Sequence, residues 1–248
     1  MKKIIITIII GSFLATAYPV WAYVMSSSSY RLQSDAVSVG GVRQTSTSYI
    51  SEDTIGEIAT GISTSASYKI KAGFQQMQEI YLSITAPDDV TLTPDIGGVS
   101  GGTANGSATW TVLTDNAGGY SLSIEADTSP ALQSGTDDFT DYIPVSGNPD
   151  FDWLVDSANS EFGFTPEGSH IIQKYKDDGD NCNAGTNDTP DSCWYNLSTS
   201  NETIGQSYLA NHPSGTNTTV KFRAQSGSSH VQQAGTYTST VTLTVISN

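Results

Sequence analysis

The chain has 248 residues, of which 10 are basic and 25 acidic, and its formal net charge at pH 7 is −15. So large a negative charge argues against nucleic acid and anionic lipid as partners, because phosphate groups are bound by Lys and Arg. The length allows one large domain, or one domain preceded by a smaller unit.

Residues 1–22 have the three parts of a secretory signal peptide. Two lysines follow Met1, an apolar run covers residues 4–14, and small residues precede a predicted cleavage site after Ala22. A cut after Ala17 is the alternative site, and an uncleaved anchor helix is the alternative to cleavage, although the run is shorter than the ~20 residues that a bilayer needs. Cleavage leaves 8 basic and 25 acidic side chains and no second spanning stretch. We therefore expect a secreted, extracellular or cell-surface protein without a transmembrane segment after signal cleavage.

A repeat occupies residues 23–79. Tyrosines that each follow a serine recur nineteen residues apart, at Tyr30, Tyr49 and Tyr68, with glycines between them. A fixed period of strand and glycine turn predicts a short segment of stacked β-units. The alternative is a chance similarity in a stretch rich in Ser and Tyr.

The pattern Ser-x-Ser-Tyr…Gly-Gly…Ser-x-Ser-Tyr…Gly…Ser-x-Ser-Tyr-x-Ile-x-Ala-Gly-Phe lies within residues 27–77. It resembles a segment near the start of many exported, uncharacterised bacterial surface proteins. The resemblance covers about a fifth of the chain and implies export to the cell surface. After residue 77 the composition changes, so we place the start of the second domain at residue 80.

Residues 80–248 are predicted to form one β-sandwich, immunoglobulin-like or jelly-roll-like, in an all-β chain where helix signals are nearly absent. Apolar residues recur at spacing two between polar turns. The predicted strands are residues 81–84, 90–92, 109–113, 120–124 and 220–224, with a glycine-rich loop at 97–106. The turn at residues 115–119 predicts a hairpin between its two flanking strands.

The clearest strand pattern lies near the end of the sequence, at residues 235–246. Apolar side chains alternate with threonines there, so one face is predicted to lie in a core and the other in water. The segment from Ala234 to Val245 is similar to the last strand of spore-coat-U-like and fimbrial-type β-sandwich subunits. That resemblance implies an extracellular structural or adhesive role.

Periodicity is lost between about residues 134 and 215, where Asp and Asn are frequent. We interpret this stretch as a long irregular acidic insertion, either an elaborated face of the sandwich or a binding segment. It contains the only two cysteines, Cys182 and Cys193. In an exported chain these are predicted to form one disulfide.

An acidic loop in this insertion carries the oxygen ligands that Ca²⁺ prefers. The candidate ligands are Asp177, Asp178, Asp180, Asn183 and Asp188. The loop does not follow the EF-hand register, because Cys182 stands where that motif needs Asp or Asn. The alternative is a solvated loop in which Asp and Asn simply favour turns.

Aromatic residues in the same insertion suggest a glycan site. A sandwich module binds sugars by stacking them on exposed rings and hydrogen-bonding them to Asn and Asp. The candidates are Trp153, Trp194 and Tyr195. For Trp194 the alternative is a core position that covers the disulfide.

We expect no enzymatic activity. Gly98-Val99-Ser100-Gly101-Gly102 matches the nucleophile-elbow pattern in letters, but no helix follows it, as that motif requires. Acids at residues 150–161 lie near Phe151 and Trp153, a composition shared by glycosidase sites and by ordinary acidic surfaces.

These patterns together predict a bacterial structural or adhesive protein of the cell surface. Its expected partners are surface proteins or glycans, and self-assembly through a strand edge is a further expectation. The alternative is a carbohydrate-binding module of the cell surface, with or without stabilisation by calcium. No other cofactor is expected.

Overall fold

A computed structural model describes residues 25–26, 31–32, 44–45, 50–51, 61–64, 69–73 and 80–248. The chain divides into two compact units, Met1–Glu79 and Ile80–Asn248. The proposed signal peptide, residues 1–22, lies outside the described residues. Within the part of the chain that is described, no helix is long and apolar enough to cross a membrane.

The described strands of the first unit form antiparallel pairs. The pairs are β1 (Met25–Ser26) with β2 (Arg31–Leu32), β3 (Gln44–Thr45) with β4 (Ile50–Ser51), and β5 (Gly61–Thr64) with β6 (Lys69–Ala72). The register repeats as well: Met25 pairs with Leu32, Gln44 with Ser51, and Ser63 with Ile70. Equivalent residues of the three pairs are therefore nineteen positions apart, the same period as the tyrosines.

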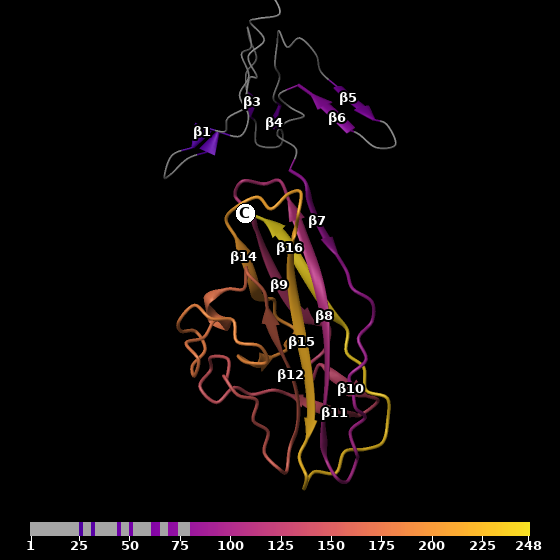
Figure 1. Cartoon of the computed structure of the whole chain (residues 1–248). Coiled ribbons are helices and arrows are strands. Elements are labelled where there is room, and N and C mark those ends of the chain that lie inside the picture. Colours follow the sequence, from indigo (N-terminus) through magenta and orange to yellow (C-terminus); the bar gives the residue numbers. More distant parts are fainter. Residues whose placement is uncertain are drawn as a thin grey trace, which may run out of the picture. The chain divides into compact units, whose positions relative to one another are not determined.

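The second unit is a sandwich of two β-sheets, so the predicted all-β sandwich is confirmed. The larger sheet has the order β10 (Leu132–Ser134), β11 (Asp137–Asp141), β12 (Ser160–Glu167), β15 (Thr216–Ser226), β8 (Gly102–Thr114) and β7 (Leu82–Thr85), with β13 (Tyr195–Asn196) also paired to β12. The smaller has the order β14 (Glu202–Ser207), β9 (Tyr120–Ala126) and β16 (Val241–Ser247). Figure 1 shows the long strands β8, β12 and β15 running along the sandwich.

Alternation builds the core. The even-numbered residues of β15 from Thr218 to Ser226 are buried, while their odd-numbered neighbours are partly exposed. β9 alternates in the same way and supplies Leu122 and Ile124 from the opposite sheet. Val112 of β8 and Val220 of β15 complete the centre, both without solvent exposure. The odd-numbered residues of β15 are thereby directed to the outer face of the larger sheet.

The predicted hairpin across residues 115–119 is wrong. The strand before this turn, β8, belongs to the larger sheet, whereas the strand after it, β9, belongs to the smaller one. The chain crosses between the sheets because both flanking strands carry an apolar face, and facing layers bury both of these faces. Asn116 supports the crossing through hydrogen bonds from its side-chain amide to the carbonyls of Gly119 and Asn248.

Two other local predictions also differ from the structure. Residues 90–92 form no strand, and only Thr93 makes an isolated bridge, to Asn105; Pro87 and Pro94 flank the segment and lack the N–H that a ladder needs. The glycine-rich loop is shorter than predicted, since Gly102 already begins β8. The strand predicted at residues 235–246 is shorter in the structure: the alternation is present from Val241, where β16 begins, and before it Thr238 makes only an isolated bridge to Gln133.

Residues 134–215 contain more regular structure than the sequence suggests. β12 pairs with β15 along its whole length and is a central strand, and β14 forms an edge of the smaller sheet. The largely irregular parts are the two segments 142–159 and 168–201, which we call the cover loops; the second contains the short 3-10 helix η1 (Gln173–Tyr175) and β13. Parts of them lie against the outer face of β12.

Candidate functional site

The site begins at a glycine in the middle of β12. Gly163 lies on the outer face of the larger sheet and is buried beneath the cover loops. A Cβ atom there would lie 2.8 Å from Tyr142 Cβ, 2.8 Å from the Tyr195 carbonyl oxygen and 3.0 Å from the Trp153 ring. The missing side chain therefore allows aromatic groups to pack directly on the strand backbone.

These aromatic groups form a continuous cluster. Trp153 stacks on Tyr142 with ring centroids 4.3 Å apart, and Trp194 meets Trp153 edge to face at 5.1 Å. The indole N–H of Trp153 donates to Gln225 Oε1 at 2.8 Å, and the Tyr142 hydroxyl donates to Asp150 Oδ2 at 2.9 Å. Every polar tip thus has a partner, as buried Trp and Tyr require.

Basic side chains of β15 lie beside the cluster. The guanidinium of Arg223 lies 4.2 Å from the Trp194 ring, within cation–π range, and its Nε donates to Asn105 Oδ1 at 2.7 Å. Lys221 pairs with Glu167 at 2.8 Å and with Asp191 at 3.1 Å. Burial lowers the pKa of Lys221, but these two carboxylates outweigh it and leave the pKa raised above its usual value.

A shallow hollow opens at the margin of the cluster. Its volume is about 270 Å³, and its lining includes Asn105, Ser107, Asp191, Trp194 and Lys221. The Asp191 carboxylate remains about half exposed, with a side-chain exposure of 55%. Amide, hydroxyl, carboxylate and ammonium groups therefore converge around one ring edge, a composition suited to hydrogen-bonding a polyhydroxylated molecule.

The predicted glycan residues are placed unequally. Trp194 is only 1% exposed, and its indole N–H donates to the Asp191 carbonyl, so no face of its ring is free for a sugar. Tyr195 is half-buried, and Lys174 Nζ lies 3.5 Å from its ring centroid. Trp153 is half-buried, with one face occupied by Tyr142. The structure brings Trp153 and Trp194 together, but as packed rings.

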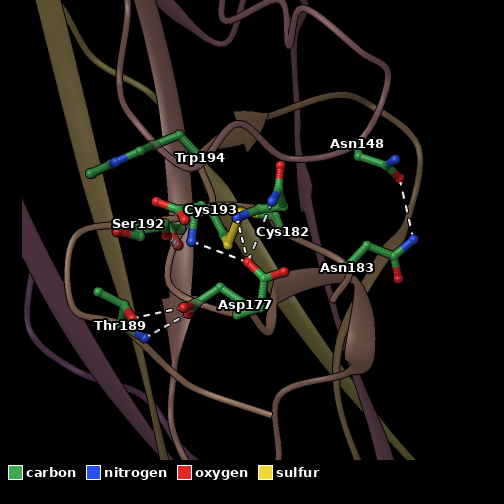
Figure 2. The surroundings of a disulfide bond; sticks show 12 residues. Asn148, Asp177, Cys182, Asn183, Thr189, Ser192, Cys193 and Trp194 are labelled. Atoms are coloured by element: carbon green, nitrogen blue, oxygen red, sulfur yellow. Dashed lines mark hydrogen bonds between the residues drawn. A yellow bond between two sulfur atoms is a disulfide. The ribbon is translucent and has the colours of Figure 1, made fainter. Parts of the chain in front are cut away.

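The disulfide predicted between Cys182 and Cys193 is confirmed. Figure 2 shows it next to Asp177 and Trp194. Cys193 is buried and packs with the hydrophobic core. The bond therefore ties the acidic loop to the segment that carries Trp194.

Asp177 organises this loop. Its side chain is fully buried, and its carboxylate accepts hydrogen bonds from the Thr189 N–H at 2.9 Å, the Thr189 hydroxyl at 2.8 Å and the Gly179 N–H at 2.9 Å. Figure 2 shows the pair with Thr189. Burial raises the pKa of Asp177, but these donors outweigh it and hold the pKa below its usual value. These protein donors stabilise the charged form of the carboxylate.

The other candidate calcium ligands are also bonded within the protein or exposed. Asp178 accepts from the N–H groups of Asp180 and Asn181, and Asp188 accepts from the Gly168 N–H. Asn183 reaches the amide of Asn148 at 3.5 Å. Among the described residues, no three His, Cys, Asp or Glu side chains gather in a way that would hold a metal ion. Calcium binding by this loop stays a prediction.

Two of the acids at residues 150–161, Asp150 and Asp156, lie close enough to Glu161 for their charges to act on it. Asp150 is bonded to the Tyr142 hydroxyl and to the Val145 N–H. Burial, together with the charges of Asp150 and Asp156, raises the pKa of Glu161. Asp150 thus serves to hold the Tyr142 hydroxyl in place.

Sequence reasoning missed Asn105, Lys221 and Arg223, which line or border the hollow. The alternating pattern of β15 could have predicted that Lys221 and Arg223 lie side by side on the outer face, because both occupy its outward positions. Asn105 lies opposite Arg223 on β8, a pairing that no single strand pattern reveals.

Compared with family models, with curated proteins and with solved structures, the chain shows no match. The fold and the site define an all-β sandwich protein with a disulfide-tied aromatic cover.

Proposed function

We propose that the chain is a secreted or cell-surface β-sandwich protein with a structural or adhesive role and no catalytic activity. The observation that supports this most is that the basic side chains of the sandwich are engaged in ion pairs and cation–π contacts within the protein. The basic residues of 80–248 are Lys174, Lys176, Lys221 and Arg223. Lys174 pairs with Glu202, Lys221 with Glu167, and Arg223 packs on Trp194.

The rest of the surface fits the same role. On the outer face of β8 and β15, Thr109 bonds to Thr219, and Thr111 bonds to Asn217. Such a flat face of hydroxyl and amide groups offers many weak hydrogen bonds to a partner and no assembled acid–base pair. The N-terminal signal pattern and the acidic composition support an extracellular location.

A panel of chromogenic glycosides and esters tests the absence of catalysis. We expect the purified chain to give no more turnover than a variant carrying Asp150→Asn and Glu161→Gln. Turnover by the unmodified chain that this double variant lacks would overturn the proposal, because the charges of Asp150 and Glu161 interact and a glycosidase uses two neighbouring carboxylates.

Carbohydrate binding is the second candidate function, and the hollow beside Trp194 is the observation that favours it. A glycan array probed with the full chain tests it directly. If the hollow binds sugars, Asn105→Ala with Asp191→Ala should abolish the signal, while Asp180→Ala on the exposed acidic loop should leave it intact. An empty array would remove this candidate and leave adhesion through protein contacts.

Calcium belongs to the same second candidate. A thermal melt with calcium and with chelator tests whether the acidic loop binds the ion. If calcium binds the folded loop, the melting temperature should fall by several degrees on chelation, because a ligand that binds only the folded state stabilises it. Equal melting temperatures would assign the loop to solvated surface.

A further inference from the structure

Strand β16 leaves a row of main-chain groups unpaired within the sandwich. It is the edge strand of the smaller sheet and pairs with β9 on one side only. Opposite Val241 lies Ala126, whose N–H donates to the Ser198 carbonyl, on the side away from β16. Val241 and Ala126 are therefore a pair without mutual hydrogen bonds.

In an antiparallel ladder such pairs alternate with bonded ones. The N–H and C=O groups of Val241, Leu243, Val245 and Ser247 consequently point to the free edge. The contacts at each end of the strand agree, because the Thr240 carbonyl and the Asn248 N–H both bond toward the β9 side. An open edge of this kind is a template for another strand.

The sequence of β16 has none of the usual edge protection, and β7, which lies near the strand, pairs with β8 and not with β16. Native edges are guarded by charged residues, prolines, bulges or short length, but residues 224–248 contain no Asp, Glu, Lys, Arg or Pro. β16 is seven residues long, and its pairing with β9 is regular throughout. Other edges of the sandwich are short or carry acids, such as Glu202 at the start of β14.

The net charge of the chain and the lack of charge on β16 together decide where two copies can approach each other. The chain has a net charge of −15, so two copies repel each other over most of their surfaces. The strand β16 itself carries no charged side chain and adds nothing to that repulsion. The outward face of the strand carries Thr242 and Thr244, which are exposed and uncharged, while Leu243 and Val245 on the inner face are only half-buried.

We propose that β16 is a self-association edge that pairs antiparallel with β16 of a second copy. A two-fold axis at Thr244 sets Leu243 against Val245, Val241 against Ser247, and Thr244 against itself. This register sets Leu243 against Val245 and Thr244 against its own copy, pairs that stabilise sheets, while Thr242 meets Ile246. It forms about eight main-chain hydrogen bonds, because all the groups that point to the free edge then meet each other. The inference rests on the strand alone and holds whether or not the proposed adhesive function is right.

Sedimentation equilibrium of the full chain tests the proposal. We expect a monomer–dimer equilibrium that strengthens with NaCl, because salt screens the repulsion between two acidic copies. Thr244→Lys should weaken the dimer at least about fivefold, because it opposes two ammonium groups at close range. Thr203→Lys makes the same charge change on exposed β14 and should not weaken it.

A second variant separates the edge from the fold. Val245→Pro removes an N–H that has no partner within one copy, so the monomer should keep its structure while the dimer is lost. Residue-resolved hydrogen exchange adds a direct readout. On concentration, the amides of Leu243 and Val245 should gain protection, whereas those of Thr242 and Thr244, already bonded to β9, should not change.

Three results would overturn the proposal. A chain that stays monomeric at about 1 mM has no such edge. A dimer that Thr244→Lys and Val245→Pro leave intact uses another surface. A dimer that forms with calcium but not with NaCl of equal ionic strength is bridged through the acidic residues.

Discussion

Asp177 is the residue on which the geometry of the acidic loop depends most. A fully buried carboxylate is costly unless hydrogen bonds replace its water, and Asp177 obtains these from Thr189 and Gly179. Its neighbours Asp178 and Asp180 are exposed. Acids close together in the sequence thus have different roles, which their positions alone do not reveal.

Replacing Asp177 tests this role. Asp177→Ala should lower the free energy of unfolding by about 2–3 kcal/mol, because buried donors lose their acceptor. Asp180→Ala, which removes an equal charge from the exposed part of the loop, should change it by less than about 0.5 kcal/mol. Urea denaturation of both variants measures the difference, and equal losses would contradict the assignment.

The lowered pKa of Asp177 also predicts a pH dependence. Its folded-state pKa lies below the ordinary value of 3.8, so its stabilising contribution is complete above that value and is lost as pH falls through the folded pKa. The raised pKa of Glu161 acts in the opposite sense. We therefore expect the melting temperatures of wild type and Asp177→Asn to converge as pH falls below about 4. A constant difference would show that the charge of Asp177 is not involved.

At the scale of elements, β12 joins the sandwich to its cover. Its inward residues Phe162 and Phe164 lie in the core, while Gly163 between them carries the aromatic cluster on the outer face. The strand is buried on both faces because the cover loops take the place of solvent. The sandwich and the aromatic cover should therefore lose stability together.

Gly163→Ala tests this coupling. The added methyl would lie 2.8 Å from the Tyr195 carbonyl oxygen and 3.0 Å from the Trp153 ring, which is closer than van der Waals contact. It should therefore lower the free energy of unfolding by about 1–3 kcal/mol through overpacking and change the tryptophan fluorescence. Gly135→Ala is not a matched control, because Gly135 has a positive φ. Thr219→Ala on the exposed outer face of β15 serves instead and should leave both readouts almost unchanged. Native-like stability of Gly163→Ala would show that the cover is loosely attached.

The elements differ in how far the sequence predicts them. β16 and β9 have one wet face and one dry face, so their alternation is visible. β12 shows no alternation, because it is buried on both sides and contains Gly163 and Pro166. The crossing after β8 was mistaken for a hairpin, because a turn pattern does not tell which sheet the next strand joins.

The sequence also predicts the candidate site only in part. The disulfide followed from two cysteines in an exported chain, and both tryptophans of the insertion do lie together. Their packing against Arg223 depends on strand pairing between distant segments, so the sequence offered only the aromatic residues. The unequal burial of the acids in the acidic loop likewise depends on contacts between distant segments.

At the scale of the whole molecule, the net charge and the disulfide both support the proposed extracellular location. The sandwich carries many acids and few bases, and the few bases hold the cover loops. Disulfides such as the one between Cys182 and Cys193 are typical of oxidising compartments, which supports the proposed export. The uncharged β16 edge is the part of this acidic protein that we propose for self-association.

Intact-mass spectrometry of the protein, recovered from a bacterial host that expresses the full sequence, tests this account most directly. The account predicts material outside the cytoplasm that begins at Tyr23, or at Tyr18 for the alternative cut. It should be lighter than the reduced chain by two hydrogens. Cytoplasmic protein that keeps residues 1–22 and both free thiols would contradict an exported surface role.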